Sequence, residues 1–148
     1  MNQRDLRTIL LVEDSAADAE MAIDALREAK LANPIVHVED GVECMDFLHS
    51  RGRFANRPPE VPAVVLLDIK MPRMDGLEAL TQMRADNALK RIPVVILSSS
   101  REESDLARSW DLGVNAYVLK PVDVQQFFTA VQTLGHFWAV LNQRPEGE

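Results

Sequence analysis

One stretch of the sequence decides the fold: Ala63-Val64-Val65-Leu66-Leu67-Asp68-Ile69-Lys70-Met71-Pro72-Arg73-Met74-Asp75-Gly76. It begins as an unbroken apolar run, which is typical of a strand buried on both faces of a parallel sheet. Asp68 follows the run at once, and Pro72 and Gly76 mark a loop. One carboxylate is therefore expected at the carboxyl end of a buried strand, where open α/β sheets bind their ligands. Because an Asp after a strand is often only a turn residue, the rest of the chain has to show what surrounds Asp68.

The composition indicates one globular domain. The 148 residues are 47% hydrophobic and 26% charged, as in ordinary globular proteins. We expect the domain to span residues 6–142, with flexible termini at 1–5 and 143–148. The start of the sequence lacks the apolar core of a signal peptide, no apolar run is long enough for a membrane span, and a single cysteine, Cys44, excludes an internal disulfide. These features predict a cytoplasmic protein without a membrane partner, and the net charge of −7 argues against nucleic-acid binding.

Apolar runs and helical spacings alternate along the whole chain. Strands are expected at 8–12, 35–38, 63–68, 94–97 and 116–119, and helices at 16–31, 41–48, 76–85, 101–112 and 123–142. Strict alternation predicts a doubly wound α/β fold, with a five-stranded parallel sheet, five helices and right-handed crossovers. The expected strand order is 2-1-3-4-5, the flavodoxin-like arrangement. The polar, proline-rich segment 50–62 is interpreted as a surface insertion, with a partner contact as the alternative.

Polar residues follow four of the five strands. Glu13 and Asp14 follow the first strand, Asp68 the third, Ser98 the fourth and Lys120 the fifth. The carboxyl ends of parallel strands meet at one edge of a sheet, and these four strands are neighbours in the expected order, so the side chains can meet. Three adjacent carboxylates repel unless a cation lies among them, and Mg²⁺ (or Mn²⁺) suits such oxygen ligands.

The same residues suit phosphoryl transfer. A carboxylate such as Asp68 is a competent nucleophile toward phosphorus and would give an aspartyl phosphate. Such a transfer depends on positioning and charge neutralisation, which the metal and Lys120 would supply. Ser98 can donate a hydrogen bond to a phosphoryl oxygen.

At these motifs the chain resembles the receiver domain of two-component response regulators. The matching segments are 11–14, 67–76, 92–98 and 116–121, in the order of that family. The resemblance implies that Asp68 accepts phosphate from a sensor histidine kinase, and that the protein is a signalling domain rather than an enzyme.

The resemblance also assigns roles to individual residues. It implies Glu13 and Asp14 as the acidic pair that holds the metal together with Asp68, and the backbone carbonyl of Lys70 as a further metal ligand. Ser98 and Lys120 would sense the phosphoryl group, and Tyr117 matches the aromatic switch position.

A narrower resemblance concerns the regulators that are paired with phytochrome histidine kinases. It depends on the 51–62 loop, on segments 97–100 and 113–117, and on Phe137-Trp138. It implies a light-sensing kinase, such as a bacteriophytochrome, as the upstream partner.

Other functions remain open at this point. An intermediate in a phosphorelay would use the same site. An aspartyl-phosphate hydrolase usually carries a second Asp two residues after the nucleophile, where this chain has Lys70. A flavin-binding module would need a phosphate-cradling loop after the first strand, where Glu13, Asp14 and Ser15 would repel a phosphate.

The output is expected to be a protein contact, since few residues follow the last helix. We expect the contact face to include the helix at 101–112, the strand at 116–119 and the last helix. Its residues would be Leu106, Trp110, Val114 and Phe137, and its partner a second copy of the chain or the kinase.

Overall fold

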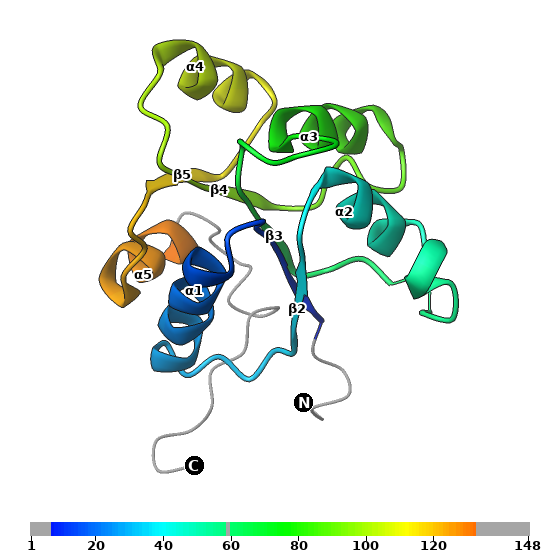
Figure 1. Ribbon diagram of the computed structural model, residues 1–148, viewed down its shortest axis with the longest axis horizontal. Helices are drawn as coiled ribbons and strands as arrows, with labels where there is room; N and C mark the ends of the chain where they lie inside the picture. The colour runs from blue at the N-terminus through cyan, green and yellow to red at the C-terminus, as the bar shows by residue number, and fades with distance from the viewer. Residues whose placement is uncertain (1–6, 59, 133–148) are drawn as a thin grey trace.

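The computed structural model describes residues 7–58 and 60–132, and these contain an alternating α/β fold (Figure 1). The strands pair in parallel in the order β2-β1-β3-β4-β5, which confirms the predicted flavodoxin-like topology. Along the chain the elements are β1 (Ile9–Val12), α1 (Ala16–Glu28), β2 (Ile35–Val38), α2 (Gly41–Leu48), the 3-10 helix η2 (Gly52–Phe54), β3 (Val64–Leu67), α3 (Gly76–Ala85), β4 (Val94–Ser98), α4 (Glu103–Asp111), β5 (Ala116–Leu119) and α5 (Val124–Gln132).

The sheet is buried on both faces because its strands are apolar at every position. Alternate residues of a strand point to opposite faces. On β3, Val64 and Leu66 pack with α1 and α5, whereas Val65 and Leu67 pack with α2 and α3. Figure 1 shows α1 and α5 side by side on one side of the sheet, with α2, α3 and α4 on the other.

The strand register determines which loop residues meet at the carboxyl edge. Val12 of β1 pairs with Leu67 of β3, so the residues that follow these strands begin at the same level. Ser98 of β4 pairs with Leu119 of β5. The polar residues predicted to meet at this edge therefore leave the sheet close to one another.

The ends of the helices are set by local hydrogen bonds. Ser15 caps α1 by accepting from the backbone N–H of Asp18, and Asp75 caps α3 by accepting from that of Glu78. The helix α1 ends earlier than expected because Lys30 has a left-handed backbone, with φ of 59°. The prediction that the last helix reaches residue 142 extends beyond the described residues.

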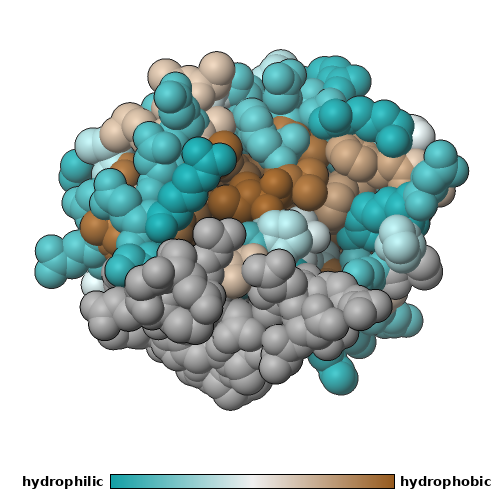
Figure 2. Space-filling view, turned by 90° about the horizontal axis from the view of Figure 1, so that it is seen from below, coloured by the Kyte–Doolittle hydropathy of each residue, from teal (hydrophilic) through white to brown (hydrophobic). Residues whose placement is uncertain are grey.

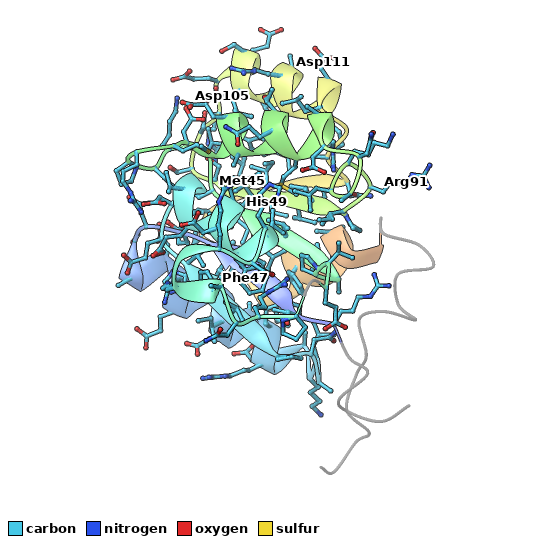
Figure 3. All side chains as sticks on the ribbon, turned by 90° about the vertical axis from the view of Figure 1, so that its right-hand side faces the viewer. Met45, Phe47, His49, Arg91, Asp105 and Asp111 are labelled. Carbon is cyan, nitrogen blue, oxygen red and sulfur yellow. The ribbon has the colours of Figure 1, made fainter. Side chains whose placement is uncertain are left out.

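The segment 50–58 folds onto α2 instead of standing away from it. Phe54 packs edge-on against Phe47, with ring centroids 5.2 Å apart. Phe47 lies on α2 (Figure 3). The guanidinium carbon of Arg57 lies 3.8 Å from the centroid of the Phe47 ring, which is cation–π geometry. Arg57 also donates to the carbonyls of Pro58 and Glu60. The insertion therefore packs over the Phe47 ring of α2.

Hydrophilic and hydrophobic residues share the face shown in Figure 2, where hydrophilic ones lie above and beside a band of hydrophobic ones. Among residues 7–58 and 60–132, no helix has the length and apolar character needed to cross a membrane.

A glycine allows the loop after β3 to return against its own start. A methyl group at Gly76 would lie 2.0 Å from the backbone oxygen of Asp68. Gly76→Ala is expected to lower the free energy of unfolding by about 2 kcal/mol or more, because backbone atoms have to move. Urea denaturation measures this change.

Gly113→Ala is the matched control. Gly113 has φ of 75°, but its added methyl group would lie no closer than 3.8 Å to its nearest neighbour, so only backbone strain of about 1 kcal/mol is expected. If Gly76→Ala lowers the free energy of unfolding by no more than Gly113→Ala does, the close approach at Gly76 does not constrain the loop.

Candidate functional site

Three carboxylates gather at the carboxyl edge of the sheet. Glu13, Asp14 and Asp68 each offer an oxygen within 4.8 Å of the other two. Glu13 and Asp68 are buried, with 2% and 6% of their surfaces exposed, whereas Asp14 is exposed. One carboxylate oxygen of Asp68 accepts from the backbone N–H of Ile69, at 2.8 Å. The predicted acidic cluster therefore forms, with two members inside the protein and one at its opening.

Lys120 brings the only ammonium group that is paired with this cluster among the residues the structure describes. Its Nζ lies 2.5 Å from Glu13 Oε1, 2.9 Å from Asp18 Oδ2 and 3.5 Å from Asp68 Oδ2. Its side chain is 13% exposed, so these charges interact with little screening by water. The predicted meeting of Lys120 with Asp68 is therefore present.

The electrostatics of the cluster reflect burial and incomplete neutralisation. Burial raises the pKa of Glu13 to about 7, although hydrogen bonds from Lys120 and from the backbone of Ser15 oppose the rise. Burial also raises the pKa of Asp68, against the opposing charge of Lys120. For Lys120 burial alone would lower the pKa, but hydrogen bonds to Glu13 and Asp18 outweigh it and raise the pKa.

The donor set fits a hard divalent cation. One ammonium cannot neutralise three carboxylates, and Mg²⁺ and Mn²⁺ prefer carboxylate oxygen ligands. Because Asp14 is exposed beside two buried carboxylates, a cation could keep part of its water shell there. The backbone carbonyl of Lys70, which the family resemblance implies as a further ligand, stays a prediction. The ammonium of Lys70 lies 3.6 Å from Asp105.

The hydroxyl residue predicted to sense phosphate is connected to the next loop. Ser98 is buried, and its Oγ accepts from the backbone N–H of Ser100 at 3.1 Å. Its carbonyl accepts from the backbone N–H of Lys120 at 2.9 Å. Ser98 therefore joins the site to the β4–α4 loop and to β5.

Tyr117 contacts the same loop from β5. Its ring is half-buried against the core, and its hydroxyl donates to the carbonyl of Ser100 at 2.9 Å. The Tyr117 hydroxyl therefore links β5 to the β4–α4 loop.

Two charged residues near the site make contacts that the sequence did not predict. Asp105 on α4 (Figure 3) is 8% exposed and accepts from the Ser100 hydroxyl at 2.7 Å. Asp18 on α1 pairs with Lys120. Neither contact has a local signal in the sequence, because each depends on how α1 and α4 pack on the sheet.

The predicted partner face is present in part. Trp110 is 52% exposed and borders a groove of about 550 Å³ between α4, β5 and α5, which Tyr117 and Leu119 also line. Leu106 is half-buried. Val114 was wrongly placed on this face: it is 5% exposed and packs in the core, because the chain turns inward there to enter β5. Phe137 lies outside the described residues.

A doubly wound sheet with an acidic cluster and a lysine at its carboxyl edge defines a receiver-type signalling domain. The chain belongs to the response regulator receiver domain family, whose model matches residues 9–132.

Known relatives point to one branch of that family. Response regulator Rcp1 of Synechocystis sp. is 37% identical, over 89% of this chain and 88% of Rcp1. Among solved structures, the bacteriophytochrome response regulator RtBRR is 51% identical with a TM-score of 0.86, over 96% of this chain and 86% of that one.

Two further structures are relevant to the chemistry. The phosphorylated cyanobacterial phytochrome response regulator RcpA is 40% identical, with a TM-score of 0.75, over 90% of this chain and 94% of RcpA. The Mn²⁺-bound form of Rcp1 is 36% identical, with a TM-score of 0.75, over 94% of this chain and 99% of that one. The predicted membership of the receiver family, and the predicted likeness to phytochrome-associated regulators, are confirmed.

The raised pKa of Glu13 predicts how stability depends on pH without metal. Folding favours the protonated carboxyl of Glu13. Its contribution to the free energy of unfolding is therefore fully present below the ordinary pKa of 4.5 and is lost as the pH rises through about 7. In EDTA, the free energy of unfolding of wild type is expected to fall by on the order of 3 kcal/mol between these two pH values, relative to that of Glu13→Gln. Urea denaturation at a series of pH values measures the difference.

Glu20→Gln removes the same charge from an exposed position on α1 and should run parallel to wild type. If the Glu13→Gln profile also runs parallel to wild type, Glu13 is not a carboxyl of raised pKa.

Proposed function

We propose that the protein is a response regulator that accepts a phosphoryl group on Asp68 from a histidine kinase. The observation that carries the proposal is the position of the Asp68 carboxylate, which is buried beside Glu13 and Asp14 with the Lys120 ammonium 3.5 Å away. This arrangement joins a nucleophile to the charge neutralisation that phosphoryl transfer requires.

The transfer follows from these residues. A carboxylate oxygen of Asp68 forms a bond to phosphorus as the bond from phosphorus to the kinase histidine nitrogen breaks, and the nitrogen keeps that electron pair. The ammonium of Lys120 stabilises the charge on the phosphoryl oxygens. Glu13, Asp14, Asp68 and the carbonyl of Lys70 would hold Mg²⁺ or Mn²⁺, which neutralises further charge on those oxygens when bound.

The signal would leave the site through Ser98. The Ser98 hydroxyl accepts from the backbone N–H of Ser100. When this hydroxyl turns to donate to a phosphoryl oxygen, the N–H of Ser100 has to move with it or lose its partner. Because Tyr117 donates to the Ser100 carbonyl, the same movement reaches β5. Phosphorylation would thereby reshape the face formed by α4, β5 and α5.

The kinase that we propose is a bacteriophytochrome. This proposal is supported by the likeness to RtBRR and RcpA, which are described as phytochrome response regulators.

The first test concerns the acceptor. Wild-type protein incubated with acetyl phosphate and Mg²⁺ is expected to gain one phosphoryl group, and Asp68→Asn none, as measured by intact mass. Asp75→Asn is the matched control, because Asp75 is in the same loop but serves as the cap of α3. Equal labelling of wild type and Asp68→Asn would contradict the proposal.

The second test concerns the metal. Ligand binding to the folded state alone stabilises it, by about 2.7 kcal/mol at a concentration 100 times the dissociation constant. We expect Mg²⁺ to stabilise wild type by about that amount, and Asp14→Asn much less, in thermal or urea unfolding. Asp24→Asn, an exposed change on α1, should keep the full effect. Full stabilisation of Asp14→Asn would remove Asp14 from the metal site.

The third test concerns the output surface. We propose that Trp110 and Leu106 contact a partner protein, either a second copy or the kinase. Sedimentation and kinase affinity of wild type should change on adding beryllium fluoride and Mg²⁺, a phosphoryl mimic, and Trp110→Ala should reduce that change.

Met21→Ala, which removes the exposed apolar side chain of α1, is the control for loss of a surface hydrophobe. If sedimentation and kinase affinity are the same for wild type and Trp110→Ala, both with and without the mimic, this face is not the output surface.

A further inference from the structure

The ammonium of Lys120 has a partner that the proposed phosphoryl transfer does not use. Asp18 reaches it from the first turn of α1, with Oδ2 2.9 Å from Nζ. The contact to Asp68 is the longest of the three that the ammonium makes, at 3.5 Å. Two carboxylates other than the acceptor thus hold the ammonium more closely than the acceptor does.

The two competing partners differ in surroundings. Glu13 is buried beside Asp68 and belongs to the acidic cluster, so it acts on the metal site as well. The Asp18 side chain is 40% exposed and is not a member of that cluster. Its charge can therefore be removed without opening a cavity or changing the metal ligands.

We propose that Asp18 is a positioning residue that holds Lys120 toward α1 and thereby competes with the phosphoryl group on Asp68 for the ammonium. This inference rests on the proposed function. An ammonium held at 2.9 Å by Asp18 has to leave or share that partner as charge develops on the phosphoryl oxygens. Asp18 therefore slows phosphorylation of Asp68 and sets how readily the site is loaded.

A purely structural role makes a different prediction. A carboxylate in the first turn of a helix also stabilises the helix through its dipole. If that were its only effect, replacing Asp18 would lower stability and leave the labelling rate unchanged.

The experiment compares initial rates of labelling by acetyl phosphate in Mg²⁺ for wild type, Asp18→Asn, Asp18→Glu and Glu20→Gln, followed by intact mass. Asp18→Asn keeps the shape of the side chain and removes its charge, so we expect labelling about two- to fivefold faster, the size of one partly exposed ion pair. Asp18→Glu restores the charge and should restore the slower rate. Glu20→Gln loses a charge elsewhere on α1 and should match wild type.

A second measurement reports position instead of rate. In a metal-free crystal structure of Asp18→Asn, Nζ of Lys120 should lie closer to Asp68 Oδ2 than 3.5 Å. Thermal unfolding checks that the variant is folded.

The failures of the two claims are distinguishable. If wild type labels on Asp68 but folded Asp18→Asn labels at the same rate with Lys120 unmoved, the role of Asp18 is refuted and the proposed function stands. If wild type does not label at all, both are refuted.

Discussion

The ion pairing of Lys120 with buried carboxylates is the interaction on which the site depends. Glu13 and Asp68 lie inside the protein, where an unpaired carboxylate is strongly disfavoured, and the ammonium between them offsets part of that cost. The compensation is incomplete, as the raised pKa of Glu13 shows. The remaining negative charge makes the site suitable for a divalent cation, which together with Lys120 would supply the positive charge that a phosphoryl group requires.

The fold holds this chemistry rigidly and connects it to a surface that can change. Asp68 follows the central buried strand, and the return of its loop leaves no room for a side chain at Gly76. The β4–α4 loop, by contrast, is held by single hydrogen bonds that converge on Ser100 from Ser98, Tyr117 and Asp105. Such bonds are weak individually and can be exchanged, so a small movement at Ser98 can reach α4 and β5.

Much of this arrangement could be predicted from the sequence because strands carry a strong local signal. The apolar runs located all five strands, and their alternation with helices predicted the order that brings Glu13, Asp68 and Lys120 together. Contacts made by helices were harder to predict. Asp18 and Asp105 point at the site only because of how α1 and α4 pack on the sheet, which spacing alone does not specify. Val114 was misplaced for the same reason: an apolar residue after a helix can face a partner or the core, and here it faces the core.

The central claim is that Asp68 becomes an acyl phosphate. Borohydride reduces an aspartyl phosphate to homoserine but leaves phosphate esters of hydroxyl residues intact, so reduction followed by peptide mass mapping locates the acceptor. After labelling with acetyl phosphate and Mg²⁺, homoserine is expected at position 68 and at no other carboxylate. Homoserine at position 14 or 18, or a phosphate that survives reduction on Ser98, would contradict the account.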